Sequence, residues 1–396
     1  MIILSCIVQK FGGTSVATLD RIRNAANIVS KAKKKYENVV VVVSAMAGVT
    51  SKFVTYADGL NAHEGNPEYD SLVSSGELVT AGLMALALNN IGLKARSYAS
   101  WQIPILTDSN FGRATIENVE TSNIRKDLDD GTIPVVCGFQ GMTADHRITT
   151  LGRGGSDSTA VALTASLGAD ICEIYSDVDG VYTVDPNLCP ESQLLSHISY
   201  LEMLEMSARG AKIMQTQSVE YAMDKKVKIR VASSFSGGDG SIISAQASGR
   251  KFCGLAVIPR LAQIKMFYKT DDGAALSVDL LRKNFIYCDV CNDQDSRKAS
   301  LLTDKKNVPA ALDLLSQQPF IRSVKQEVTQ RHSSKISIIS MNNSEKAAIE
   351  LVTEFSRRRM EVFCHFYSAN RTSLIVPGHK LMSMITVLHR YCGLDK

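Results

Sequence analysis

The sequence has few of the features that mark membrane proteins or nucleic-acid-binding proteins. Its 396 residues carry a net charge of only +4, and 21% of them are charged. No broad basic stripe interleaved with aromatic residues is present, so we expect no nucleic-acid partner. We also find no stretch that approaches the ~18 consecutive apolar residues of a membrane span, so we expect no membrane partner.

The nine cysteines lack the spacing of paired metal-binding motifs. Cys288 and Cys291 form one C-x-x-C motif, a spacing found at redox and zinc sites, but no second pair or nearby histidine completes it. We therefore expect no metal site and interpret the cysteines as reduced thiols of a cytoplasmic protein. The apolar start Met1 to Val8 has no basic residues before it, so we interpret it as a first strand rather than a signal peptide.

The length and the hydrophobic patterns predict two or three domains. Helical and strand patterns alternate over residues 1–245, which predicts an α/β/α sandwich with a mainly parallel sheet. We interpret Val227 to Val231 as the last strand of this domain and the Ser/Gly-rich stretch 233–240 as a linker. Residues 250–396 contain two weakly similar strand–helix–strand passages, which predict an α+β region of two βαββαβ modules.

The stretch Thr150 to Pro186 contains the most distinctive loops of the chain. It begins with three glycines around Arg153, followed by Ser156, Asp157 and an apolar helix whose N-terminus would suit an anion. The glycine spacing differs from the dinucleotide fingerprint, and no Gly-Lys-Ser/Thr follows the glycines, so the loop is not a P-loop either. A strand then runs into residues 176–183, which are rich in oxygen and charge. In an open parallel sheet such loops meet at one edge, where ligands bind.

Charged and hydroxyl side chains gather in the loops of residues 1–245, most of them just after predicted strands. No histidine lies in these loops, so neither a Ser-His-Asp nor a Cys-His arrangement is indicated. Cations beside Gly/Ser loops without a general base fit phosphoryl transfer, in which positioning and charge stabilisation dominate catalysis. A carboxylate acceptor would need no base, since it is already anionic. The cations are Lys10, Arg153 and Lys212; the carboxylates are Glu77, Asp157, Asp177 and Asp179.

Seven motifs over about residues 7–245 agree in order and spacing with those of one family. They are K-F-G-G-T-S at 10–15, V-S-A-M-A-G-V-T at 43–50, S-G-E at 75–77, G-F-Q-G at 138–141, T-L-G-R-G-G-S-D at 150–157, E-I-Y-S-D-V-D-G-V-Y-T-V-D-P at 173–186 and G-A-K at 210–212. Together they resemble the aspartate kinases. The resemblance implies an amino-acid kinase fold over 1–245 and phosphoryl transfer from ATP to the side-chain carboxylate of L-aspartate. The product would be 4-phospho-L-aspartate, the first intermediate toward lysine, threonine and methionine and toward diaminopimelate.

The same resemblance implies roles for individual residues. Lys10 would neutralise the transferring phosphoryl group, Asp157 would orient Lys10, and Mg²⁺ would be bound mainly through ATP. Arg153 would bind carboxylate oxygens of aspartate in a forked geometry that suits guanidinium, and Glu77 would receive the substrate ammonium. The other residues expected to contact aspartate are Ser44, Thr50 and Ser156. The other residues expected to contact ATP are Gly12, Gly13, Ser176, Asp177, Tyr182 and Lys212.

Aspartate kinases often carry two C-terminal ACT-type modules that bind lysine or threonine and form dimers, so we expect a homodimer or a higher homo-oligomer. In this chain the turn at 340–345 lacks the glycine expected in the second module, whereas Gly273 is present in the first. Because such turns usually hold the effector through backbone groups, we expect weak or altered inhibition by lysine or threonine.

Two alternatives stay open at the sequence level. Another amino-acid kinase, such as glutamate 5-kinase, shares the fold, but the contexts of Glu77 and Arg153 favour aspartate. A catalytically silent amino-acid sensor would have lost a charged catalytic residue, whereas Lys10, Asp157 and Lys212 are all present together with Glu77 and Arg153.

Overall fold

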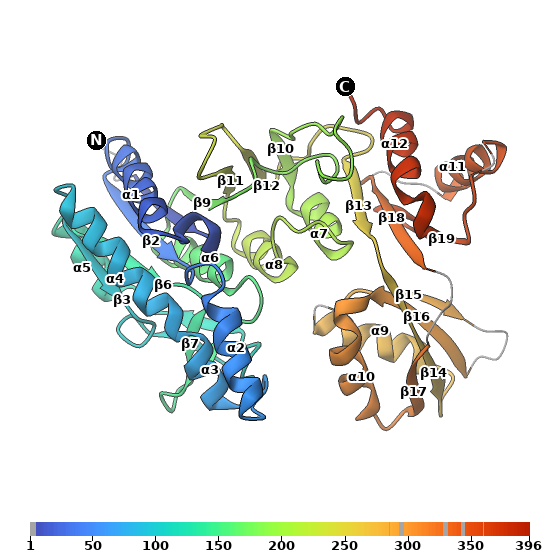
Figure 1. Cartoon of the computed structure of the whole chain (residues 1–396), viewed down its shortest axis with the longest axis horizontal. Helices are drawn as coiled ribbons and strands as arrows, with labels where there is room; N and C mark the ends of the chain where they lie inside the picture. The colour runs from blue at the N-terminus through green and yellow to red at the C-terminus, as the bar shows by residue number, and fades with distance from the viewer. Residues whose placement is uncertain (1–4, 285, 293–296, 328–331, 342–344, 359) are drawn as a thin grey trace. The chain divides into compact units, whose positions relative to one another are not determined.

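The computed structural model describes residues 5–284, 286–292, 297–327, 332–341, 345–358 and 360–396. The chain forms two compact units (Figure 1). The first unit comprises Met1–Val181, Leu194–Tyr200 and Ile213–Ala247, and the second comprises Tyr182–Gln193, Leu201–Lys212 and Ser248–Lys396. Two short segments that precede residue 245 in the sequence therefore pack with the C-terminal unit.

An eight-stranded sheet forms the centre of the first unit, in the order β10-β12-β11-β9-β1-β2-β6-β3. Among its neighbouring strands only β11 and β12 are antiparallel. The α/β sandwich with a mainly parallel sheet is thereby confirmed. The strands are β1 Cys6–Phe11, β2 Asn38–Val43, β3 Ala95–Tyr98, β6 Ile133–Cys137, β9 Ile171–Ser176, β10 His197–Ser199, β11 Ile229–Ser233 and β12 Ser241–Ser244.

Helices cover this sheet. Successive side chains of β1 point to opposite faces of the sheet. Ile7 and Phe11 pack in one core with the helices α1 and α4, whereas Lys10 points to the other face and reaches α6. Helix α6 is buried almost throughout, as expected for the central helix of a sandwich. The helices are α1 Leu19–Lys33, α2 Val49–Gly59, α3 Pro67–Val73, α4 Ser75–Asn90, α5 Ser122–Asp129, α6 Gly155–Leu167, α7 Tyr200–Ala208 and α8 Thr216–Lys225, with a 3-10 turn at Gly13–Val16.

A smaller four-stranded sheet in the order β5-β4-β7-β8 completes the first unit. Its strands are β4 Ile105–Thr107, β5 Ile116–Val119, β7 Gln140–Met142 and β8 Ile148–Thr150. Two residues separate β6 from β7, and β8 leads into α6 through residues 151–154, so this sheet holds the start of the loop before α6.

The interpretation of residues 233–240 as a domain linker is wrong. This stretch joins β11 to β12, which pair antiparallel within the large sheet, so the stretch is a hairpin connection. For the same reason Val227 to Val231 does not contain the last strand of the unit. Ser and Gly residues favour hairpin turns as much as linkers, so composition alone could not separate the two.

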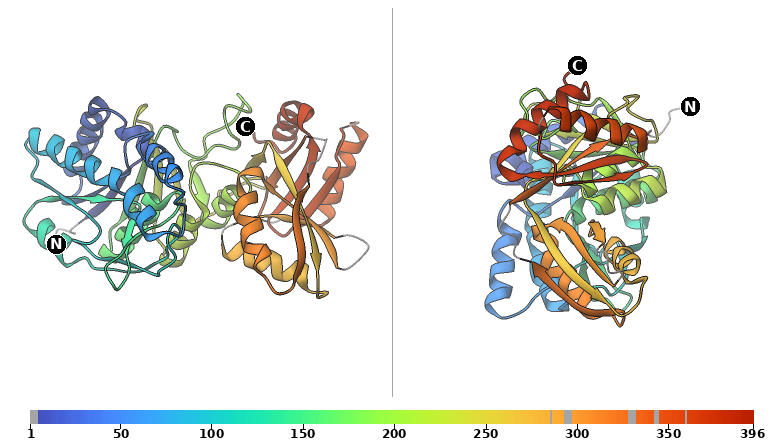
Figure 2. Two further views of the ribbon diagram at one scale, coloured as in Figure 1. Left: turned by 60° about the horizontal axis from the view of Figure 1, so that its bottom comes forward. Right: turned by 90° about the vertical axis from the view of Figure 1, so that its right-hand side faces the viewer.

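The second unit consists of two ferredoxin-like modules, as Figure 2 shows from two further sides. The first module has the sheet order β15-β16-β14-β17, and the second has β13-β18-β20-β19. Strand β13 precedes the whole first module in sequence, yet it pairs with β18 and so supplies the fourth strand of the second module. One module is therefore nested inside the other.

The predicted strand–helix–strand passages match the elements of both modules. In the first module they are β14 Leu261–Tyr268, α9 Gly273–Lys283, β15 Asp289–Asn292, β16 Lys298–Asp304, a 3-10 turn at Lys305–Asn307, α10 Val308–Ser316 and β17 Ile321–Glu327. In the second they are β13 Gly254–Ile258, β18 Ser333–Ile339, α11 Glu345–Arg357, β19 Cys364–Ser368, β20 Arg371–Pro377, a 3-10 turn at Gly378–Lys380 and α12 Leu381–Tyr391. The glycine-free turn of the second module includes 342–344, which lie outside the described residues.

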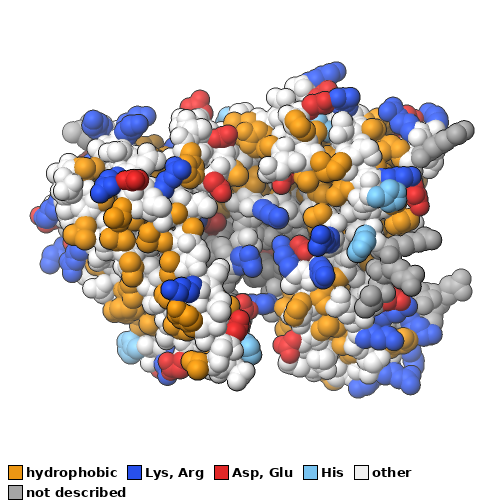
Figure 3. Space-filling model, viewed as in Figure 1, with side chains coloured by type: hydrophobic (Ala, Val, Ile, Leu, Met, Phe, Trp, Pro, Cys, Tyr) orange, Lys and Arg blue, Asp and Glu red, His pale blue; other side chains and the backbone are white. Residues whose placement is uncertain are grey.

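The sequence analysis predicted no stretch long and apolar enough to cross a membrane, but the helical stretch Pro67–Asn90 meets that test. By length and composition it could cross a membrane, but half of its apolar window is buried inside the first unit. This is the pattern of a core helix. Figure 3 shows hydrophobic side chains over α2 and α4, where Leu60, Val79 and Leu86 are exposed.

Candidate functional site

The carboxyl ends of β1, β2, β6 and β9 bring four loops to one edge of the large sheet. Backbone hydrogen bonds join these loops across the edge. The N–H of Gly12 donates to the carbonyl of Tyr175 at 2.9 Å, and the N–H of Gly138 donates to the carbonyl of Val43 at 2.9 Å. The N–H of Ser44 donates to the carbonyl of Phe11 at 3.1 Å. The loops thus form one fixed surface at the edge where parallel sheets bind ligands.

A buried ion pair lies at this edge. The Nζ atom of Lys10, near the end of β1, is 2.6 Å from Oδ1 of Asp157 in the first turn of α6. Lys10 is 8% exposed and Asp157 is 7% exposed. The Lys10 ammonium and the N-terminus of the buried helix α6 are both groups that can interact favourably with an anion, and the low exposure strengthens such an interaction. The sequence analysis expected these two residues to act together, and they are in contact.

Glu77 is the second buried charge of the site. It is 3% exposed, and its Oε1 accepts the N–H of Ala45, in the loop after β2, at 3.0 Å. Its Oε2 is buried and has no hydrogen-bond partner among the described residues. Burial raises the pKa of Glu77 to about 7. A buried carboxylate with a free oxygen is costly unless a cation or donor reaches it, so Glu77 is suited to receive a positively charged group.

Hydroxyl groups and close backbone contacts line the same loops. The Oγ atoms of Ser44 and Ser156 are 2.9 Å apart, which connects the loop after β2 to the start of α6. A Cβ on Gly13 would lie 2.9 Å from the carbonyl oxygen of Ala45, so the first two loops pack backbone against backbone. Thr50 lies in the first turn of α2 and is half-buried.

Arg153 is exposed at the tip of the glycine loop that leads into α6. Gly152 and Gly154 flank it with φ of +70° and +77°, a left-handed conformation that glycine adopts at little cost. Asp70, which the sequence analysis did not single out, holds the start of this loop. Its Oδ2 accepts the N–H of Thr150 at 2.7 Å and the N–H of Gly112 at 2.8 Å.

The predicted nucleotide contacts are divided between the two units. Ser176, whose Oγ accepts the N–H of Val178 at 3.3 Å, is the last residue of β9, and the exposed Asp177 begins the loop after it. Tyr182 and Lys212 belong to the second unit, and their contact with ATP stays a prediction. Within the described part of the chain no three His, Cys, Asp or Glu side chains cluster as a metal site.

A second buried network behind the site was missed by sequence reasoning. Glu173 of β9 accepts from Gln9 at 2.7 Å and from Arg230 of β11 at 2.7 Å. The Tyr175 hydroxyl donates to Glu173 at 3.0 Å, and the Tyr175 ring stacks on Phe11. The network ties β1, β9 and β11 together below the loops. The available signal was a glutamate within an otherwise apolar strand, since a charge at such a position needs a partner.

The contact between Gly138 and Ser156 gives a testable prediction. A Cβ at Gly138 would lie 2.7 Å from both Cβ and Oγ of Ser156. We expect Gly138→Ala to displace the start of α6 and destabilise the protein by about 1–3 kcal/mol. Thermal unfolding measures this loss. Gly82→Ala is the matched control, because a Cβ there meets nothing within 4 Å and alanine favours a helix. Equal effects of the two substitutions would contradict the prediction.

Comparisons with known proteins agree on one group. The model of the amino acid kinase family matches residues 5–233. An aspartokinase of Rickettsia felis is 45% identical over 247 residues, which are 61% of this chain and 62% of that protein. An aspartokinase of Bacillus sp. strain MGA3 is 35% identical over 98% of this chain and 97% of that protein. The solved structure of E. coli aspartokinase III with aspartate and ADP superimposes with a TM-score of 0.78 at 23% identity, covering 98% of this chain and 99% of that one.

Proposed function

The chain belongs to the amino acid kinase family, and we propose that it is an aspartate kinase, which transfers the γ-phosphoryl group of ATP to the side-chain carboxylate of L-aspartate. The matched region spans 62% of the Rickettsia felis relative but 97% of the Bacillus relative. The observation that carries the proposal is the unpaired, buried Oε2 of Glu77 in α4, whose other carboxylate oxygen binds the loop after β2 at the sheet edge that also carries the Lys10–Asp157 ion pair. The ammonium of an amino acid would bind Oε2 of Glu77. The negative charge of a phosphoryl group would interact with the Lys10 ammonium.

In the proposed reaction an oxygen of the aspartate side chain attacks the γ-phosphorus. The bond between that phosphorus and the β,γ-bridging oxygen breaks, and ADP leaves with the electron pair. Lys10 would stabilise the charge on the transferring group, and such preorganised charge is usually the largest catalytic contribution. Asp157 would act as a positioning residue, because its carboxylate already holds the Lys10 ammonium at 2.6 Å.

We assign the orientation of the substrate to two charged side chains. Glu77 would bind the ammonium of aspartate, and Arg153 would bind its carboxylate oxygens in a bidentate geometry. Ser44, Thr50 and Ser156 would line the pocket. A Mg²⁺ ion would come with the ATP phosphates, in keeping with its preference for phosphate and water oxygens. When bound it would neutralise charge on the phosphates. Asp177, an exposed carboxylate of the predicted nucleotide loop, would face the bound nucleotide.

We further propose that lysine or threonine inhibits the protein only weakly or in an altered way through the second unit, that the chain forms a homodimer or a higher homo-oligomer, and that it acts in the cytoplasm.

The proposed function is tested by trapping the acyl phosphate with hydroxylamine. Purified protein is incubated with ATP, Mg²⁺ and L-aspartate, and the aspartyl hydroxamate is measured with and without lysine and threonine. We expect ATP-dependent hydroxamate from aspartate and none from glutamate. Hydroxamate from glutamate alone would indicate another amino-acid kinase, and none from a folded protein would favour the silent sensor.

The raised pKa of Glu77 predicts a pH dependence. The ionised carboxylate binds an ammonium and the protonated form does not, so kcat/KM for aspartate should fall about tenfold per pH unit below about pH 7. In Glu77→Gln this titration should be absent, and KM for aspartate should rise about 10- to 100-fold. Steady-state kinetics between pH 5.5 and 8.5, with the KM for ATP as the internal control, would measure both effects. The same pH profile in Glu77→Gln as in the unsubstituted protein would assign the titration to another group.

Glu77 also affects the pH dependence of folding stability. Its contribution to stability changes with pH in the opposite direction to its contribution to kcat/KM. The folded-state pKa of Glu77 lies above its ordinary value of 4.5, so the folded state binds more protons than the unfolded state between about pH 4.5 and 7. The contribution of Glu77 to stability therefore decreases as pH rises through that window.

A further inference from the structure

Two cysteines lie on the edge strands of the two modules in the second unit. Cys291 is on β15, the edge strand of the first module's sheet. Cys364 begins β19, the edge strand of the second module's sheet. Both residues are half-buried, so neither is sealed from a small reagent. The two cysteines are far apart in the sequence, and the proximity of their thiols is a property of the fold.

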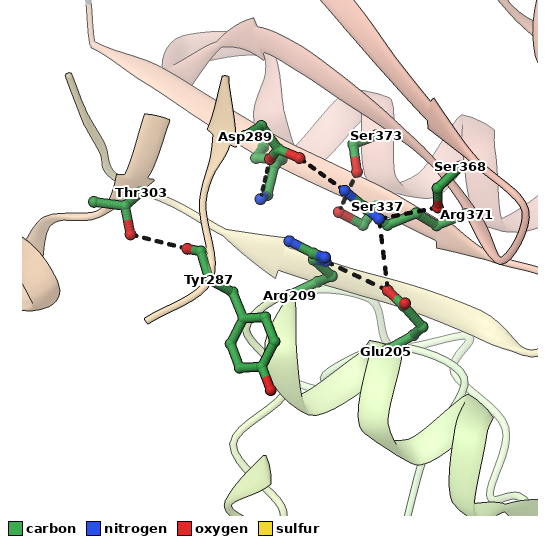
Figure 4. A network of polar contacts seen from close by, with 10 residues as sticks. Glu205, Arg209, Tyr287, Asp289, Thr303, Ser337, Ser368, Arg371 and Ser373 are labelled. Carbon is green, nitrogen blue, oxygen red and sulfur yellow. Dashed lines mark hydrogen bonds and ion pairs between the residues drawn. The ribbon is translucent and has the colours of Figure 1, made fainter. Parts of the chain in front are cut away.

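A buried ion cluster joins β15 to the second module, and Figure 4 shows Asp289, Arg371 and Glu205 within it. Oδ2 of Asp289 on β15 is 2.6 Å from Nζ of Lys335 on β18, and Oδ1 is 2.8 Å from Nη2 of Arg371 on β20. Lys335 is fully buried and Asp289 is 4% exposed. The cluster extends to Glu205, which lies 3.8 Å from Arg371. The position of Asp289 against the second module is therefore fixed by two charged partners.

The strand register places Cys364 on the face of the second sheet that meets β15. Lys335 pairs with Ile375, and Ile375 pairs with Cys364, so these three side chains form one row on one face of the second sheet. Cys291 is two residues beyond Asp289, so it shares the strand face that meets Lys335. The row and the face of β15 bring the two thiols close enough to interact, and this interaction lowers the pKa of Cys291 and raises the pKa of Cys364.

The two cysteines of the C-x-x-C motif, Cys288 and Cys291, have different surroundings. Cys288 packs against the hydrophobic core of the first module, and burial raises the pKa of its thiol to about 11. Positions three apart along extended chain point to opposite faces, so Cys288 and Cys291 do not face each other. The partner of Cys291 is Cys364.

We propose that Cys291 and Cys364 are a redox-active pair that forms an intramolecular disulfide, which would covalently link the two modules. The hydrogen bond from the Cys364 thiol holds the pKa of Cys291 below its ordinary value, so Cys291 is the attacking thiolate. The oxidant is a low-molecular-weight disulfide such as oxidised glutathione. The Cys291 thiolate attacks one sulfur of it, and the first small thiolate leaves. Cys364 then loses its proton, attacks Sγ of Cys291 and displaces the second. Two protein thiols become one disulfide, and the oxidant is reduced to two small thiols.

The test is disulfide mapping on the full chain. Reduced protein is treated with oxidised glutathione, blocked with N-ethylmaleimide, digested without reductant and analysed by mass spectrometry. We expect a Cys291–Cys364 linked peptide as the main oxidised product. We also expect the thermal midpoint of the oxidised protein to exceed that of the reduced protein by at least about 5 °C, because the crosslink closes a long loop.

Two variants and one control make the result specific. Cys291→Ser and Cys364→Ser should each lose the linked peptide and the thermal shift, whereas Cys6→Ser, a half-buried cysteine of the first unit, should keep both. Mapping on the unsubstituted chain does not depend on the folding of any variant. Only mixed disulfides, only links between two chains, or a link from Cys291 to Cys288 would overturn the proposal. Because neither readout uses kinase activity, failure here is separate from failure of the proposed function.

Discussion

Replacement of Lys10 by methionine is expected to lower kcat for aspartyl hydroxamate formation about 10²- to 10³-fold, the usual effect of removing one preorganised charge-stabilising group. Methionine keeps most of the volume of lysine but removes its charge. The KM values should change little, since the proposed role of Lys10 is strongest in the transition state. Steady-state kinetics of the purified variant would measure the effect.

Three comparisons make the Lys10 experiment specific. Lys94→Met is the matched control, because Lys94 is exposed and pairs with exposed Asp130, and it should keep full activity. Asp157→Asn should lower kcat less than Lys10→Met, since the ammonium stays but loses its fixed position. Lys10→Arg should recover part of the activity. A Lys10→Met variant with more than about a third of the unsubstituted kcat would remove Lys10 from the mechanism, because a charge effect of that size is below 1 kcal/mol.

Replacement of Asp289 by alanine is expected to destabilise the second unit by about 3–5 kcal/mol, as is typical when one partner of a buried ion pair is removed. The substitution leaves Lys335 and Arg371 buried without their shared carboxylate. Arg209 adds a further buried guanidinium nearby, and its Nη1 has no partner among the described residues. Uncompensated positive charge would therefore accumulate in the interior of the unit.

Hydrogen–deuterium exchange of peptides from β16 and β18 would measure the Asp289→Ala effect within the second unit. Exchange should accelerate about 10²- to 4 × 10³-fold, since each 1.4 kcal/mol corresponds to a factor of ten. Asp271→Ala is the matched control, because its pair with Arg297 is 72% and 59% exposed in the two side chains and is worth about 0–1 kcal/mol. Equal exchange in the two variants would show that the buried cluster contributes no more than a surface pair.

The ion cluster also has a defined pH dependence. Burial alone would raise the pKa of Asp289, but the ammonium of Lys335 and the guanidinium of Arg209 hold it below the ordinary value of 3.8. A carboxyl whose folded-state pKa is depressed contributes stability above its unfolded pKa and loses it as pH falls. The contribution of Asp289 should therefore be complete at neutral pH and disappear in acid.

The sequence by itself determined the parts of this protein that depend on local pattern. The five valines of β2, the apolar run of β6 and the glycine-flanked Arg153 loop predicted strands and a helix entry where the structure has them. Motif spacing also predicted the family, because a loop that packs backbone against backbone, as Gly13 does against Ala45, restricts residue type strongly.

The pairing of distant segments was decided only by the tertiary structure. Nothing in β13 itself says that it completes a module whose other strands begin 75 residues later, at Ser333, or that 233–240 is a hairpin. Hydrophobic period reports which face of a strand is buried, but it does not report which strand lies beside it. For the same reason Asp70 at the Arg153 loop, Glu173 beneath the site and the Cys291–Cys364 pair were absent from the predictions. Each depends on a partner brought close by the fold, and such contacts leave no periodic trace in the chain.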